Sequence, residues 1–165
     1  MKKPTIYLDT NIVSALHYIG TDINTLSRRM ATRDWWDSER RHFDVVASSF
    51  TELELAAGQY PGQASSVRFV RRLPYVPITR LARNLADELL EQDVIPAGKR
   101  GDAMQLALAA AHEFDYLLTW NYAHLANPLT QARAERLFAK CGCRAPLLVS
   151  PETIPQVKFN KTIRR

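Results

Sequence analysis

The sequence alternates short apolar runs with longer stretches of helical periodicity, and this alternation limits the fold more than any other feature. A short run of β-branched, aromatic or aliphatic residues between turn-forming residues is typical of a buried strand. Repeated strand–helix units favour a mainly parallel sheet with helices on both faces. We therefore predict a three-layer α/β/α fold. The expected extended segments are residues 5–8, 43–47, 75–78, 116–119 and 147–149, and the expected helices are residues 12–18, 22–41, 48–58, 63–72, 81–92, 102–112 and 129–140.

The composition fits one compact domain, which we place at residues 1–155, followed by a basic tail over residues 156–165. The chain has 165 residues, 46% of them hydrophobic, and carries a net charge of +5. A basic balance favours a polyanionic partner, although it is common in other proteins. Part of the charge lies in the helix expected over residues 22–41, where it forms either a solvated face or a surface that contacts RNA. These residues are Arg28, Arg29, Arg33, Arg40 and Arg41.

The cysteines and the apolar segments bear on the cellular compartment of the protein. Cys141 and Cys143 are one residue apart, too close for an ordinary disulfide, and no second Cys pair or His pair completes a zinc site. We therefore expect reduced thiols in a cytoplasmic protein. The strand pattern begins directly after Pro4, which leaves no apolar region for a signal peptide. No stretch approaches the roughly 18 apolar residues that a membrane span needs.

Asp9 closes the first apolar run and is followed directly by Thr10 and Asn11. This order predicts a carboxylate at the carboxyl end of a central strand, just before a helix. Ligands of open α/β sheets bind at this edge. An Asp in this position also forms turns and caps helices, so its role depends on whether other acids reach the same edge.

Two acids, Glu52 and Glu54, lie in the helix expected after Ser48-Ser49. Helical periodicity predicts an inner stripe of Phe50, Leu53 and Ala57, with Glu54 near it and Glu52 on the opposite side. Ser49 and Glu52 also have the spacing of a capping box, which gives Glu52 a local role. A buried carboxylate is costly unless a cation or donor compensates it, so Glu54 is either a site residue or the partner of a nearby Arg.

Asp102 and Asn121 complete the set of candidate side chains. Asp102 opens the most apolar of the expected helices, where it either contributes to a site or only stabilises the first turn. Asn121 follows the strand that ends at Thr119, and it either forms a turn or supplies a neutral oxygen ligand.

Carboxylates gathered at one sheet edge need a cation. At 4 Å and an effective dielectric near 20, two of them repel by about 4 kcal/mol. Oxygen ligands with no His or Cys at ligand spacing select Mg²⁺ or Mn²⁺ over zinc. On a basic protein, such a cluster suits phosphodiester hydrolysis by metal activation of water.

Several segments, in this order and spacing, resemble the PIN-domain family, and specifically the VapC-type toxins of bacterial toxin–antitoxin modules. Each segment is weak singly, but together they span nearly the whole chain. They are residues 7–11, residues 54–58, residues 101–107, residues 115–125 and the closing residues 145–152.

This resemblance implies a PIN-like fold and an Mg²⁺- or Mn²⁺-dependent endoribonuclease that cleaves structured RNA such as tRNA. It also implies a cognate antitoxin and a homodimer. By position, Asp9, Glu54 and Asp102 match the family's metal-binding acids, and Asn11 and Thr119 match its supporting polar positions. Two positions depart from the pattern.

The first departure is Asn121, which stands where the family has a fourth acid, so a second metal site is in doubt. We still include Asn121 among the expected catalytic residues. The second departure is Gln105, which stands where close relatives tend to have His. We therefore assign Gln105 no role in proton transfer.

Three other functions remain open at this stage. A PIN-like domain with three acids and Asn121 could bind RNA or a partner without cutting it. A phosphatase could use Asp9 as its nucleophile, but Asn11 stands where that chemistry normally needs a second acid. Dinucleotide binding is disfavoured because no Gly-rich turn follows the first strand.

Overall fold

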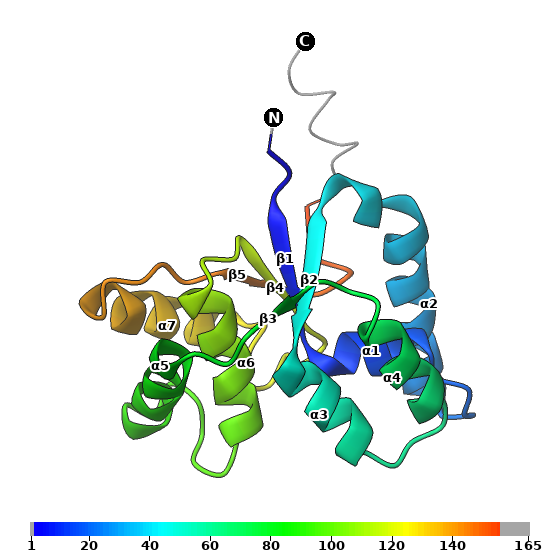
Figure 1. The fold of residues 1–165 in the computed structure, drawn as a ribbon, viewed down its shortest axis with the longest axis horizontal. Coiled ribbons are helices and arrows are strands. Elements are labelled where there is room, and N and C mark those ends of the chain that lie inside the picture. Colours follow the sequence, from blue (N-terminus) through cyan, green and yellow to red (C-terminus); the bar gives the residue numbers. More distant parts are fainter. Residues whose placement is uncertain (1, 156–165) are drawn as a thin grey trace.

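The structure is a computed structural model that describes residues 2–155 (Figure 1). Its centre is a five-stranded sheet in the order β3-β2-β1-β4-β5, in which every neighbouring pair is parallel. The strands are β1 (Thr5–Leu8), β2 (Asp44–Ser48), β3 (Tyr75–Val76), β4 (Tyr116–Leu118) and β5 (Leu147–Val149). The predicted α/β class and parallel sheet are confirmed. The predicted basic tail over residues 156–165 lies outside the described residues.

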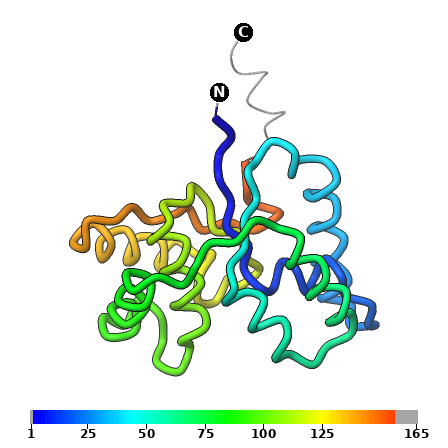
Figure 2. The backbone as a smooth tube through the Cα atoms, viewed as in Figure 1, coloured from blue at the N-terminus to red at the C-terminus, as the bar shows by residue number. Residues whose placement is uncertain are grey.

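Helices cover both faces of this sheet, and each face has its own apolar core. The helices are α1 (Thr10–Leu16), α2 (Ile23–Ser38), α3 (Ser49–Ala57), α4 (Gln63–Val70), α5 (Arg80–Glu91), α6 (Arg100–Ala111) and α7 (Pro128–Lys140), with a 3₁₀ turn at Arg40–His42. Ile6 and Leu8 of β1 pack into the core formed with α1, α2 and α4, which we call the first layer, whereas Tyr7 points into the core formed with α5, α6 and α7, the second layer. Figure 2 shows the chain crossing from the first layer to the second after α4.

Side-chain caps explain where several helices begin. Asp22, Thr79 and Asn127 each accept a hydrogen bond from the backbone N–H three residues later, at the starts of α2, α5 and α7. Pro128 then occupies the first turn of α7, where its missing N–H costs nothing. The predicted helix over residues 22–41 ends earlier, at Ser38, and a separate 3₁₀ turn follows it.

Helix α3 differs from its predicted cap. Its N-cap is Ser48, the last residue of β2, whose Oγ accepts the Thr51 N–H at 3.1 Å. Glu52 is therefore not part of a capping box. Instead its carboxylate accepts hydrogen bonds from Arg71 Nε at 2.6 Å and Tyr75 Oη at 3.0 Å.

The predicted inner stripe of α3 is confirmed at Phe50, which packs against the core, and was wrong at Leu53 and Ala57. Leu53 is 62% exposed and Ala57 is exposed, while Thr51 and Leu55 are the buried residues. Hydrophobicity could not identify Thr51, because its burial is compensated by hydrogen bonds to Ser48 and Tyr7. Glu54 nevertheless lies on the partly buried side of the helix.

Helix α6, the most apolar of the predicted helices, is buried in the layer that covers one face of the sheet. Ala103–Ala110 are all buried, because the helix is packed between the sheet and the helices around it. Among residues 2–155, no helix is long and apolar enough to cross a membrane. Neither Cys141 nor Cys143 forms a disulfide within that part of the chain.

The strand order changes direction between β1 and β4. From β1 the chain adds β2 and β3 on one side of the sheet, and then returns to add β4 and β5 on the other. Leu8 pairs with Leu118, so the residues that follow them, Asp9 and Thr119, leave the sheet side by side. In α/β sheets, ligands bind at such a switch point.

Candidate active site

Asp9 lies in this switch point, buried between the ends of β1 and β4. It occupies the N-cap position of α1, where the Thr10 N–H hydrogen-bonds to its carboxylate, but within the described chain its side chain does not make the usual N-cap hydrogen bond. Its Oδ2 instead accepts hydrogen bonds from Thr119 Oγ1 at 2.7 Å and Asn11 Nδ2 at 3.0 Å. Asn11 and Thr119 therefore support Asp9 directly. The capping role left open by the sequence does not account for this side chain.

Glu54 approaches the same edge from α3. Its Oε1 accepts hydrogen bonds from Thr10 Oγ1 at 2.7 Å and from Gln105 Nε2 at 2.6 Å. Its Oε2 lies against the start of α6, where a Cβ added to Gly101 would be only 2.9 Å from it. The absence of a side chain at residue 101 thus leaves room for the Glu54 carboxylate. Among residues 2–155, Glu54 forms no ion pair with an Arg, which was the alternative role for this side chain.

Gln105 and Tyr7 form a buried polar network behind Glu54. Tyr7 Oη donates to Gln105 Oε1 at 2.6 Å and also contacts Ser48 Oγ at 2.7 Å and Thr51 Oγ1 at 3.2 Å. Because Tyr7 takes the amide oxygen of Gln105, the amide nitrogen is left to face Glu54. Burial raises the pKa of Tyr7 well above its usual value, so Tyr7 keeps its proton as a donor. Neither Tyr7 nor Gln105 was predicted from the sequence as a site residue.

Asp102 reaches the site from the first turn of α6. Its Oδ2 is 2.9 Å from Nδ1 of His124, which follows β4. The His124 backbone N–H donates to Asn121 Oδ1 at 3.0 Å, and the Asn121 N–H donates to Thr119 Oγ1 at 3.0 Å. Asn121 therefore builds the turn that presents His124 to Asp102. His124 could not be predicted from the sequence as a site residue, because its contact with Asp102 joins residues 22 positions apart.

The three acids act on one another electrostatically. Burial, together with the negative charges of Glu54 and Asp102, raises the pKa of Asp9 from 3.8 to about 7, against the opposing effect of the Thr119 hydrogen bond. Desolvation is the largest cause, and the two neighbouring carboxylates add to it. A carboxylate in such surroundings is a candidate site residue, because a bound cation would stabilise its charged form.

The donor chemistry of this edge fits a hard divalent cation. Carboxylate oxygens are the ligands that Mg²⁺ and Mn²⁺ prefer. The acids are not gathered around one point, however, since Glu54 is hydrogen-bonded to Thr10 and Gln105, and Asp102 to His124. Accordingly, no three His, Cys, Asp or Glu residues among residues 2–155 are grouped closely enough to hold a metal.

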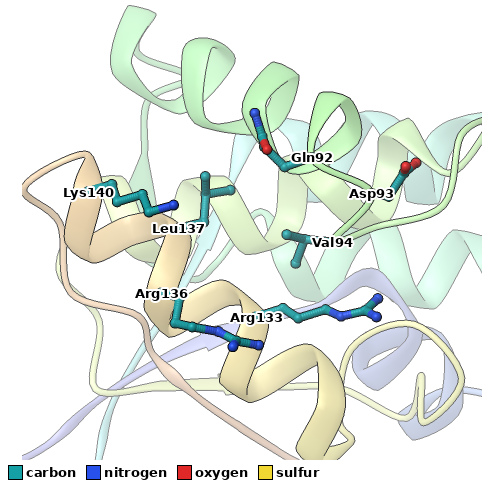
Figure 3. Close-up of a pocket in the computed structure, with 7 residues that line it drawn as sticks. All are labelled: Gln92, Asp93, Val94, Arg133, Arg136, Leu137 and Lys140. Atoms are coloured by element: carbon teal, nitrogen blue, oxygen red, sulfur yellow. The ribbon is translucent and has the colours of Figure 1, made fainter.

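A separate basic hollow of about 420 Å³ lies between α7 and the segment after α5 (Figure 3). Arg133, Arg136 and Lys140 of α7 lie beside Gln92, Asp93 and Val94 in this view. It contains none of the three acids of the switch point. This hollow is therefore distinct from the candidate active site.

Comparisons with known proteins place these features in a family. The sequence profile described as the PIN domain matches residues 6–125, which include every candidate site residue. No curated protein matches the chain significantly.

Two solved structures are similar in fold. One is VapBC2 from Rickettsia felis bound to a DNA fragment from its promoter, with 15% identity, a TM-score of 0.51 and coverage of 88% of this chain and 98% of the other. Another is a toxin–antitoxin complex from Klebsiella pneumoniae, with 19% identity, a TM-score of 0.51 and coverage of 76% and 93%. At these identities the similarity shows the fold alone. The match over residues 6–125 shows that the chain belongs to the PIN domain family.

Proposed function

We propose that this protein is an Mg²⁺- or Mn²⁺-dependent endoribonuclease that acts as the toxin of a toxin–antitoxin pair. The observation that carries the proposal is the environment of Asp9. This acid is buried at the switch point of the sheet, and that burial, together with the negative charges of Glu54 and Asp102, raises its pKa to about 7. A divalent cation shared with these two acids would compensate the charge of Asp9.

Asp9, Glu54 and Asp102 would hold the metal ion. A bound Mg²⁺ or Mn²⁺ lowers the pKa of water and stabilises the charge that develops on the leaving oxygen of a phosphodiester. Asn11 and Thr119 keep Asp9 in place, and Gln105 and Thr10 do the same for Glu54. Asn121 supports the loop that carries His124, and it can add a neutral oxygen to the site.

The proposed biological role rests on the residue pattern and on general charge. The net charge of +5 suits RNA, and the resemblance to VapC-type toxins suggests structured RNA such as tRNA as the substrate. The two similar structures both come from toxin–antitoxin complexes, which supports an antitoxin as the partner of this chain. We also propose a homodimer, as the resemblance suggests.

The test is RNA cleavage by the purified protein with Mg²⁺ or Mn²⁺ and with EDTA. We expect cleavage of total tRNA with either ion and none with EDTA. Asp9→Asn and Asp102→Asn should abolish cleavage without lowering the melting temperature. A protein that binds the RNA but never cleaves it, whichever ion is added, would instead be a PIN-fold binding module.

A further inference from the structure

Two neighbouring hollows lie beside the acidic site and share the same central residues. One is about 500 Å³ and the other about 240 Å³, and Asn11, Arg28 and Trp120 line both. The larger also includes Asn121 and Tyr122, and the smaller also includes Tyr18. The hollows thus lie between Asn11, which hydrogen-bonds to Asp9, and an Arg with aromatic side chains around it.

Arg28 is held at this place although its side chain is exposed. Its guanidinium lies 5.5 Å from the centre of the Trp120 ring, which is a cation–π contact. Thr32, one turn along α2, accepts a hydrogen bond from Trp120 Nε1 at 2.9 Å and donates to the Arg28 carbonyl at 2.6 Å. No ion pair within residues 2–155 uses Arg28. The guanidinium therefore lies over Trp120 with its donors available to an anion.

Tyr122 offers an aromatic surface on the other side of Trp120. Its ring meets Trp120 edge-on at 6.3 Å, and its hydroxyl donates to Ser150 Oγ at 2.8 Å and Glu152 Oε2 at 3.0 Å. The residue is still 38% exposed. These contacts hold the ring in one orientation while leaving part of it open to solvent.

Asn11 connects this surface to the acids. Its Nδ2 donates to Asp9 Oδ2, and its Oδ1 accepts the Trp120 N–H at 2.9 Å. The position of the Arg28 and Tyr122 surface is therefore set relative to Asp9 by direct hydrogen bonds. A polymer bound at Asp9 would extend into the hollows beside it.

We propose that Arg28 and Tyr122 form a nucleotide subsite for single-stranded RNA next to the cleaved bond, an inference that rests on the proposed function. Arg28 binds a backbone phosphate through its planar donors. Tyr122 stacks against the base of that nucleotide. The guanidinium thus suits the phosphate of a nucleotide, and the partly exposed ring suits its base.

This assignment also separates the arginines of residues 22–41 from one another. Arg40 lies 4.9 Å from the Trp36 ring, and Arg33 lines a different hollow with His17 and Phe69. Arg28 is the α2 arginine that lines the hollows containing Asn11. The arginine series is therefore not one continuous RNA-contact face, and Arg28 is the member placed for the substrate.

The experiment measures binding of a short, labelled, mixed-sequence single-stranded RNA by fluorescence anisotropy in EDTA, over a series of salt concentrations. The variants are Arg28→Ala, Arg28→Lys, Tyr122→Ala and Tyr122→Phe. Arg136→Ala is the matched control, because it removes the same charge from the hollow shown in Figure 3. Melting curves establish that each variant is folded.

Arg28→Ala should reduce the slope of log K against log salt by about 0.7, the contribution of one phosphate contact on single-stranded nucleic acid. Arg28→Lys should retain that slope. Tyr122→Ala should weaken binding about fivefold or more through lost stacking, whereas Tyr122→Phe should bind as the wild type does. Arg136→Ala should leave both the affinity and the slope unchanged.

Equal slopes for the wild type and Arg28→Ala would overturn the subsite, as would equal losses in Arg28→Ala and Arg136→Ala. Cleavage with Mg²⁺ is measured separately on the wild type. If the protein binds RNA through Arg28 but does not cleave it, the proposed function is refuted and the nucleotide subsite is retained.

Discussion

Glu52 and Glu54 lie two residues apart in α3, yet they meet different surroundings. Glu52 binds Arg71 and Tyr75 on the surface, whereas Glu54 accepts hydrogen bonds from Thr10 and Gln105 beside the switch point. The turn of the helix separates them, because residues two apart in a helix point to different sides. These two glutamates are therefore a matched pair for testing the site.

Glu54→Gln should lower RNA cleavage by about 100-fold or more, because Glu54 is a proposed metal ligand. Even a mutation of a residue that only hydrogen-bonds to a metal ligand typically lowers metal affinity or activity 10–100-fold. Glu52→Gln should retain cleavage and lose little stability, since its ion pair with Arg71 is on the surface. Initial cleavage rates and urea unfolding of both variants provide the measurement. Loss of activity in the Glu52 variant with retention in the Glu54 variant would show that the wrong acid was assigned.

Gly101 provides a second test at the scale of a residue. A methyl group at this position would come within 2.9 Å of Glu54 Oε2, so the carboxylate must move. The helix itself tolerates Ala, which is favoured over Gly by up to about 1 kcal/mol. Gly101→Ala should therefore lower cleavage about 10- to 100-fold through misplacement while stability stays equal or rises. Unchanged cleavage would mean that the position of Glu54 is not critical.

Sequence patterns identified the residues that follow strand ends better than those inside the polar network. Asp9 and Thr119 could be predicted because parallel strands place their carboxyl ends together. Tyr7, Gln105 and His124 could not, because their roles come from hydrogen bonds between residues far apart in the chain. Tyr7 in particular has the sequence environment of any core aromatic residue.

At the scale of elements, the turn between β4 and α7 connects the sheet to the acids. Asn121 accepts the His124 N–H, and His124 contacts Asp102. Within this turn, Asn121 stands at the position where the resemblance to VapC-type toxins led us to expect a fourth acid. An amide there forms the turn but brings no charge to offset a second cation.

Asn121→Asp should tighten metal binding in the absence of RNA and shift the optimum for cleavage to lower Mg²⁺ or Mn²⁺. The Asp can still accept the His124 N–H, so the turn should persist. Calorimetric metal titration of both proteins tests this. If affinity and stoichiometry are equal, residue 121 lies outside the metal site and serves only the turn.

The elements themselves were predicted closely where apolar runs are bounded by turns, as in β5, and less closely where a cap decides the boundary. Helix α1 begins two residues before its predicted start because Asp9 takes the N-cap position. The buried side of α3 was missed because Thr51 is buried by hydrogen bonding. Hydrophobic periodicity detects apolar burial and does not detect such residues.

In the whole molecule, the strand order buries Asp9 at an edge of the sheet where it feels the negative charges of Glu54 and Asp102. This charge should make stability depend on pH in the metal-free protein. The pKa of Asp9 is raised from 3.8 to about 7, so between these values the folded protein holds a proton that the unfolded chain has released. The contribution of Asp9 to stability therefore falls as pH rises through this window and remains lost above it.

Asp9→Asn removes the buried negative charge that lowers stability at high pH, and it keeps a side-chain oxygen that accepts hydrogen bonds from Thr119 and Asn11. In EDTA, the variant should gain stability over the wild type at pH 8 and gain less at pH 5. Urea unfolding at the two pH values gives the comparison, with Asp34→Asn on the exposed side of α2 as the control. A gain that is the same at both pH values would mean that the charge of Asp9 is not the source.

We propose that Asp9, Glu54 and Asp102 belong to one metal site, and Mn²⁺ titration by calorimetry is the direct test. The wild type should bind Mn²⁺, and Asp9→Asn, Glu54→Gln and Asp102→Asn should each lose most of that binding, because each removes a charged oxygen ligand. Glu52→Gln should bind as the wild type does. Mn²⁺ binding that is equal in the wild type and in all three site variants would contradict the claim.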